Sequence, residues 1–281
     1  MFLLICSLLS SILTAQSYEV TPYGAKVASL AEGGRAFING YDSIMINPAG
    51  TAMIEDPQFG FAFDAANYVS MSIGYVDDSG FHIMQVFKDI DSAFSVAGAQ
   101  TYAGFSYALS KYWLVGANFG YNYYQDDNGW DVNFGLDFGP GLKNATRTGF
   151  IGAVTVRNPF ENGGQGEVSG TLGYSYKSAF SITIDNIYVF QDDIIIGTTV
   201  VDRKRYDIVM ALESYPLESD DYCMSFAGRI EDVSGDNNLK FGIGFGYVGD
   251  TFRADLGLFA TKFEKSKIEK MTFALSLIFG V

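Results

Sequence analysis

Residues 168–176 read Val-Ser-Gly-Thr-Leu-Gly-Tyr-Ser-Tyr, so bulky apolar residues alternate with small or polar ones. Successive side chains of a β-strand point to opposite faces, which gives this segment one apolar face and one small, polar face. The same alternation recurs in 206–213, 239–248 and 271–279. A water-soluble sandwich would carry charge on its second face, whereas here that face is mostly small and neutral. This pattern is typical of a barrel whose outside meets lipid and whose inside is narrow and wet.

Turn residues such as Gly249-Asp250 separate the alternating segments, and no long helical crossover connects them. The sequence therefore predicts an all-β, antiparallel, up-and-down transmembrane barrel. The candidate strands are 57–65, 67–76, 80–88, 102–110, 112–123, 129–139, 148–157, 167–177, 178–186, 193–202, 205–213, 221–230, 238–248, 250–261 and 268–280.

Fifteen candidates are one too many, because single-chain bacterial barrels close with an even number of strands. The weak alternation of 194–201 favours a hairpin or strand extension outside the wall, and 80–88 is the second choice. We predict 14 strands, with 12 and 16 left open. Residues 57–281 then provide about 16 residues for each strand and its connection, enough for the ~10 that cross the membrane.

The beginning of the chain differs from the rest. Residues 1–16 form an uncharged apolar run that predicts a secretory signal peptide cleaved after Ala15, although no Lys or Arg precedes the run. A lipoprotein signal at Cys6 is less favoured, because Ile5 is not the small residue expected before a lipidated cysteine. We assign 1–16 to the signal, 17–56 to an irregular Gly- and Ala-rich segment with a short helix over 25–30, and 57–281 to the barrel.

Composition argues against several other classes of protein. The net charge of −14 disfavours nucleic-acid binding, which needs clustered Lys and Arg. His82 is the only histidine, so a Ser-His-Asp triad or a histidine-rich metal site would have to be built around it alone. Without the signal, Cys223 is the single cysteine, and we expect an inert, inward-facing thiol. We predict no catalytic residue, no metal site and no cofactor.

Charged residues within the predicted strands occupy the alternate positions that face the inside of the barrel. Opposite signs occur together, which predicts ion pairs across the lumen and to the N-terminal segment rather than an ion-selective lining. The residues expected to point inward are Asp64, Asp131, Asp137, Arg157, Asp185, Asp207, Glu213, Arg229, Lys240, Arg253 and Asp255.

Aromatic residues lie at or near strand ends, where a membrane barrel carries its interfacial girdles. They are Trp113, Tyr121, Tyr123, Trp130, Tyr174, Tyr176, Tyr222 and Tyr247.

Residues 40–53 read Gly-Tyr-Asp-Ser-Ile-Met-Ile-Asn-Pro-Ala-Gly-Thr-Ala-Met and lead directly into the first strand. Pro48 fixes its own φ and disfavours helix at Asn47, the Asn47 side chain can bond nearby backbone, and Gly50 permits a left-handed turn. A rigid kink is expected, and taken alone it could be an ordinary turn before the strand.

An acidic residue followed by Asn-Pro-Ala-Gly, between a signal and a barrel, resembles the FadL-type outer-membrane transporters of hydrophobic compounds and their PorV-like relatives, which include spirochaete barrels. Asp42 and 47–50 agree with that pattern, whereas Tyr41 and 44–46 are larger than usual. Segments 132–140 and 149–159 also resemble these proteins. The resemblance implies that 17–56 folds into the lumen as a hatch, with Asp42, Asn47, Pro48, Ala49 and Gly50 as hatch or gating residues.

Two functions follow from this resemblance. The first is passive uptake of hydrophobic small molecules, such as long-chain fatty acids, by a monomer in the outer membrane of a diderm bacterium. Its partners would be outer-membrane lipid and the hydrophobic ligand, and 80–101 would interrupt the wall for sideways release. The alternative is a PorV-like platform or shuttle that binds exported proteins, which the short loops favour.

Overall fold

The computed structural model describes residues 24–65, 69–90, 96–124, 127–140, 148–159, 166–177, 179–190, 194–196, 199–201, 204–215, 221–233, 238–249, 251–264 and 267–280. The predicted signal peptide lies outside these residues. Within them, 14 antiparallel strands close into one barrel, which confirms the predicted fold class and strand number.

Each strand of the wall pairs with its neighbours in the chain, apart from the step from β9 to β12. The wall comprises β1 (Gln58–Ala65), β2 (Val69–Val76), β3 (Phe81–Ile90), β4 (Val96–Ser110), β5 (Trp113–Tyr124), β6 (Asp127–Phe138), β7 (Thr148–Arg157), β8 (Gly166–Tyr176), β9 (Phe180–Phe190), β12 (Arg205–Ser214), β13 (Tyr222–Glu231), β14 (Asn238–Val248), β15 (Phe252–Glu264) and β16 (Lys267–Gly280).

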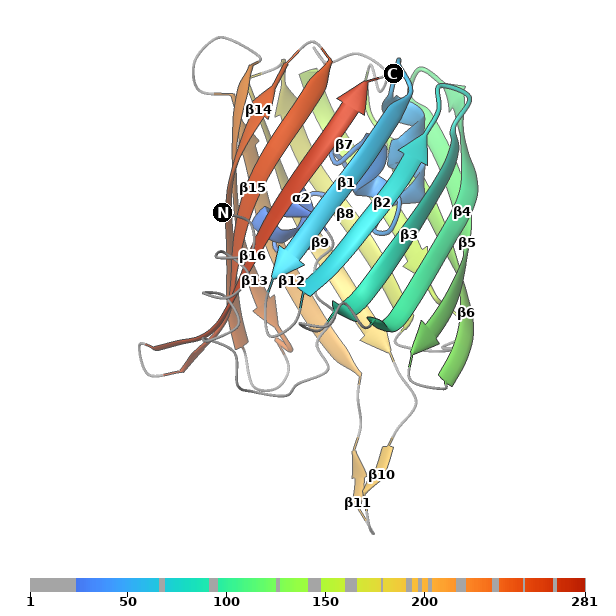
Figure 1. Ribbon diagram of the computed structural model, residues 1–281. Coiled ribbons are helices and arrows are strands. Elements are labelled where there is room, and N and C mark those ends of the chain that lie inside the picture. The colour runs from blue at the N-terminus through green and yellow to red at the C-terminus, as the bar shows by residue number, and fades with distance from the viewer. Residues whose placement is uncertain are drawn as a thin grey trace, which may run out of the picture.

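The seam of the barrel joins the first and last strands. β1 pairs with β16 from Gln58–Gly280 to Ala65–Phe273. Between β9 and β12, β10 (Ile194–Ile196) and β11 (Thr199–Val201) form a separate two-stranded sheet that projects from one end of the barrel (Figure 1). This confirms that the weakly alternating segment lies outside the wall. We call this end the hairpin end, and the end where β16 finishes the C-terminal end.

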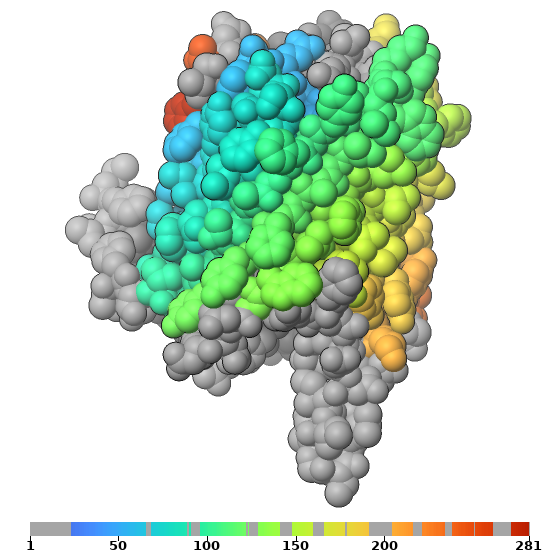
Figure 2. All heavy atoms as spheres, turned by 90° about the vertical axis from the view of Figure 1, so that its right-hand side faces the viewer, coloured from blue at the N-terminus to red at the C-terminus, as the bar shows by residue number. Residues whose placement is uncertain are grey.

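The segment 80–101 does not interrupt the wall where the structure describes it. β3 pairs with β4 from Phe81–Phe105 to Ile90–Val96, and the irregularity is a register shift against β2 between Val69 and Met71. β3 belongs to the wall because His82 points inward and is fully buried, while Ile83 points outward and is 40% exposed. Residues 91–95 lie outside the described residues. Figure 2 shows this side of the barrel as an unbroken surface.

The outer surface of the barrel is apolar over its whole described circumference. Phe150 and Leu172 are 80% and 67% exposed. Trp113 and Tyr123, at opposite ends of β5, are also exposed. At ~3.4 Å per residue and a tilt of about 40°, they stand ~26 Å apart along the barrel axis, the height of a hydrocarbon core. The outside is therefore built to meet lipid.

Inside the barrel lies the hatch, which we define as residues 24–56 of the described chain. It contains the short helix α2 (Ala25–Ser29) and two 3-10 helices, η1 (Gly40–Ser43) and η2 (Pro48–Met53). α2 packs against β14, β15 and β16, and η2 packs against β4, β5 and β6. The hatch thus crosses the lumen from one wall to the other (Figure 1). Among the described residues, no helix has the length and hydropathy needed to cross a bilayer.

Candidate functional site: the hatch and its anchors

The hatch fills the middle of the barrel. Every residue from 24 to 54 is buried except Glu32 and Asn39, which are half-buried. Small and apolar residues pack together in this segment, and its few polar side chains reach the wall. The contacts of these side chains therefore hold the segment inside the barrel.

Asn47 joins three parts of the structure with one side chain. Its Nδ2 donates to the backbone oxygen of Arg35 at 2.7 Å and to Oδ1 of Asp137 on β6 at 2.6 Å. Its Oδ1 accepts from the backbone N–H of Ala49 at 3.3 Å and so caps η2. An asparagine offers both donors and an acceptor, which these three bonds require.

The wall is hollowed where Pro48 and Ala49 approach it. A Cβ on Gly116 of β5 would collide with the backbone of Pro48, and one on Gly135 of β6 would collide with Oδ1 of Asn47. Ala49 is fully buried between them, beside Leu114. These wall glycines allow backbone-to-backbone contact that no larger residue would permit.

The expected left-handed turn at Gly50 is wrong, because Gly50 is absent from the described residues with positive φ. This residue must be small for a different reason. A Cβ there would meet the backbone oxygen of Ile38 at 2.5 Å and the side chain of Ser43.

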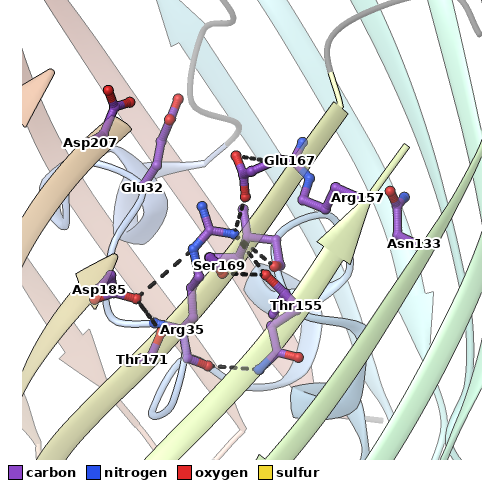
Figure 3. Close-up of polar contacts among 12 residues, drawn as sticks. Glu32, Arg35, Asn133, Thr155, Arg157, Glu167, Ser169, Thr171, Asp185 and Asp207 are labelled. Carbon is purple, nitrogen blue, oxygen red and sulfur yellow. Dashed lines mark hydrogen bonds and ion pairs between the residues drawn. The ribbon is translucent and has the colours of Figure 1, made fainter. Parts of the chain in front are cut away.

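Arg35 is the charged hub of the hatch and is fully buried (Figure 3). Its Nη1 lies 2.7 Å from Oε1 of Glu167 on β8 and donates to Oγ1 of Thr155 on β7 at 3.2 Å. Asp185 of β9 accepts from the backbone N–H groups of Gly34 and Arg35 at 3.0 and 3.3 Å. Three strands thus hold this turn of the hatch by its backbone and its side chain.

A second group of charges continues along the hairpin end. Arg229 of β13 pairs with Glu32 of the hatch and lies 2.6 Å from Oδ2 of Asp207 on β12. Burial disfavours the charged form of Glu32, but the Arg229 guanidinium holds the pKa of this carboxyl below its usual value. Arg205 and Lys240 extend the network through Glu231, at 3.0 and 2.8 Å.

Toward the C-terminal end, α2 is attached by both charged and neutral contacts. Lys26 Nζ lies 2.7 Å from Oε2 of Glu213 on β12. The hydroxyls of Ser29 and Ser225 of β13 are 2.6 Å apart. The backbone N–H of Ala25 donates to Ser276 of β16 at 2.8 Å. Three strands, among them the seam strand β16, therefore hold the first turn of the hatch.

Asp42 and its neighbour Tyr41 lie on η1. The Tyr41 ring packs where Gly60 and Gly74 of β1 and β2 leave space, and its hydroxyl lies 2.7 Å from that of Ser72. Asp42 is buried and lies 3.7 Å from Nη1 of Arg253 on β15. Tyr41 is thus larger than the resemblance leads one to expect, and the wall compensates with glycine.

The hydroxyl group of Thr51 attaches η2 to β3 and β4. Thr51 Oγ1 lies 2.6 Å from Ser106 Oγ on β4 and 3.2 Å from Nδ1 of His82 on β3. A cavity of about 390 Å³ opens beside these contacts. It is lined by Ala52 of the hatch, by the turn 78–80 and by 106–108 of β4. The lone histidine therefore fastens the hatch.

The structure brings the five predicted hatch residues into the lumen, although 47–50 and Asp42 lie in separate clusters. All eleven charges expected to point inward do so, and Arg157 and Arg253 remain half-buried. Sequence reasoning missed Lys26, Glu32, Arg35, Glu167 and Glu231. A signal was available for two of them, because Lys26 and Arg35 are the only cations in the hatch.

Cys223 is buried, and its sulfur lies 4.0 Å from Oδ1 of Asp255. This confirms that the thiol faces inward. Across the described chain, no group of three or more His, Cys, Asp or Glu residues could hold a metal ion.

Comparison of the fold with solved structures finds hydrocarbon channels. The Pseudomonas putida toluene transporter TodX is 12% identical, with a TM-score of 0.60, over 94% of this chain and 98% of that one. The Ralstonia pickettii toluene transporter TbuX is 11% identical, with a TM-score of 0.62, over 94% and 100%. The CymD monoaromatic hydrocarbon channel is 11% identical, with a TM-score of 0.62, over 94% and 99%.

The chain has the fold of these channels. The fold expected from the FadL-type resemblance is thereby confirmed. No protein-family model matches the sequence, and no curated protein matches it either. A closed barrel with an apolar exterior is the one β architecture that spans a bilayer, so the described chain is built as a membrane-spanning barrel.

Proposed function

We propose that this protein is a passive outer-membrane channel for hydrophobic small molecules, closed at rest by the hatch. The observation that carries the proposal is a lumen filled by residues 24–54 in a barrel with the fold of hydrocarbon channels. A plug attached by hydrogen bonds and ion pairs can move without breaking a covalent bond. Apolar solutes cross the polar surface layer of an outer membrane poorly, so a protein path gives them a route.

For the ligand we propose two classes of hydrophobic compound. Long-chain fatty acids are the class that the FadL-type resemblance implies, and small aromatic hydrocarbons are the class named for the structurally similar channels. The sheet 194–201 at the hairpin end belongs to the longest connection between wall strands, residues 191–204. Since longer loops of such barrels face outward, we place the hairpin end on the cell exterior. Ligand would then meet the Arg35 and Arg229 networks first.

Locking the hatch tests the proposal. Ser29 and Ser225 have hydroxyl oxygens 2.6 Å apart, so Ser29→Cys with Ser225→Cys places two thiols where a disulfide forms. The background carries Cys6→Ser and Cys223→Ser. Uptake of a fluorescent fatty acid, and of radiolabelled toluene in parallel, is measured in vesicles that contain lipopolysaccharide. We expect uptake when the pair is reduced and a drop to the protein-free level when it is oxidised.

The matched control is Ser175→Cys with Ser181→Cys, whose hydroxyls are 2.9 Å apart on the paired strands β8 and β9. This disulfide staples two wall strands and leaves the hatch free, so uptake should continue in both redox states. Uptake that survives oxidation of the hatch pair, or that never exceeds the protein-free level, would refute the channel. Recovery of an exported protein with the purified barrel in place of uptake would favour the platform alternative.

A further inference from the structure

Four carboxylates and two cations meet where η1 and α2 pack against the wall. Asp42 comes from η1, Asp64 from β1, Glu213 from β12 and Asp255 from β15. The cations are Lys26 of α2 and Arg253 of β15. All four carboxylate residues are buried, so water does little to screen the repulsion between those that are ionised.

Both cations are already engaged by other carboxylates. Lys26 lies 2.7 Å from Glu213. Arg253 turns Nε and Nη2 toward Asp255, at 2.7 and 2.9 Å. Asp64 in turn accepts from the backbone N–H of Gly24 with both oxygens, at 3.2 Å. Each of these groups therefore has a close partner of its own.

Asp42 is the exception in this cluster. Neither of its carboxylate oxygens has a hydrogen-bond partner among the described residues, and its nearest cation atom is Nη1 of Arg253 at 3.7 Å. The other ionisable group on its own helix is Tyr41, whose hydroxyl bonds Ser72. An ionised carboxylate with no hydrogen bond is costly to bury, whereas the protonated form is not.

We propose that Asp42 is a proton-dependent latch: it must be protonated for η1 to pack most firmly against the wall, and its ionisation favours release of the hatch. Consistent with this geometry, burial raises the pKa of Asp42 from its usual value near 4 to about 6.

The direction of the pH effect follows from the linkage between proton binding on Asp42 and packing of the hatch. The packed hatch binds a proton on Asp42 more tightly than a released, hydrated hatch does, so acid strengthens packing. This stabilisation is fully present below about pH 4 and is lost as the pH rises through about 6. The channel would therefore be held shut under mild acid and be easier to open at neutral pH.

Cys223 provides a readout that needs no transported ligand. Its buried thiol lies beside Asp255, within the same cluster. We expect it to become reachable when the hatch leaves. The full chain carries Cys6→Ser, so that Cys223 is the one thiol, and is labelled with 4,4′-dithiodipyridine in detergent. Each rate is divided by that of the urea-unfolded chain at the same pH, which removes the reagent's own pH dependence.

We expect normalised labelling to be about tenfold slower at pH 5 than at pH 7.5, the factor that follows from a carboxyl with these packed and released pKa values. In Asp42→Asn the rate should be the same at both pH values and close to the wild-type rate at pH 5. Asp42→Leu, which needs no hydrogen bond, should also be independent of pH.

Asp64→Asn is the matched control, because it removes the neighbouring carboxylate and keeps an oxygen for Gly24. It should retain the pH dependence, with a midpoint shifted to lower pH. A wild-type rate that does not change between pH 5 and 7.5 would overturn the proposal. So would an unchanged dependence in Asp42→Asn, or its loss in Asp64→Asn alone. Failure of ligand uptake would leave these labelling results intact, so the latch and the channel are tested separately.

Discussion

At the scale of the residue, Asn47 joins two parts of the hatch to each other and to the wall. Asn47→Ala leaves the backbone oxygen of Arg35 and Oδ1 of Asp137 without this donor. We expect a loss of about 2–4 kcal/mol of hatch packing, since each buried group deprived of a partner costs about 1–3 kcal/mol. Limited trypsin digestion should cleave the variant within 24–57, and the barrel should keep its heat-shifted mobility in gels. Asn186→Ala is the control, because Asn186 faces outward and bonds only exposed Tyr206. Equal resistance of both variants to trypsin would contradict this role of Asn47.

The ion pair of Arg229 supports a second prediction at this scale. Arg229→Met removes the cation that faces both Glu32 and Asp207, which should weaken hatch packing by about 3–5 kcal/mol. Adding Glu32→Gln to Arg229→Met should restore part of the loss, because the stranded hatch carboxylate is then gone. The rate of Cys223 labelling reports hatch packing in the wild type, the single variant and the double variant. A double variant no better packed than the single one would argue against this pairing.

At the scale of the element, the hatch helices are seated on wall glycines. A Cβ on Gly257 of β15 would collide with the backbone oxygen of Ala25 in α2, whereas Gly170 of β8 has open space around it. Gly257→Val should therefore expel α2 and raise Cys223 labelling at least tenfold. Gly170→Val should leave labelling unchanged, because valine favours strands and meets nothing there. Folding of both variants is checked by circular dichroism, and similar labelling of the two would refute the seating role of Gly257.

At the scale of the whole molecule, the apolar exterior predicts how depth in the membrane governs stability. Ile243 lies in the middle of β14 and is 46% exposed, so Ile243→Lys should destabilise the folded barrel by about 2–4 kcal/mol in vesicles. Tyr247→Lys, near the end of the same strand, should cost about 1 kcal/mol or less. Urea titration in phospholipid vesicles provides both values. Equal costs at the two depths would mean that this surface does not face hydrocarbon.

Much of the molecule could be predicted from its sequence, because side chains along a strand point alternately inward and outward. A strand has a side-chain period of two, so one correct assignment places every charge along it, as for Asp185 and Asp207. Strand pairing through short turns then gives the topology. The partners of Arg35 could not be predicted, because Glu167 and Asp185 meet it only after the barrel closes. Gly50 shows the same limit: its small size reflects contacts with Ile38 and Ser43 rather than its own backbone conformation.

The position of the hatch in the chain has a consequence for biogenesis. It precedes β1, yet α2 rests on β14, β15 and β16, which are made last. Since α2 needs these late strands and η2 needs β4, β5 and β6, the hatch gains its full set of contacts only when the β1–β16 seam closes the wall. We therefore expect packing of the hatch and closure of the barrel to be coupled during assembly.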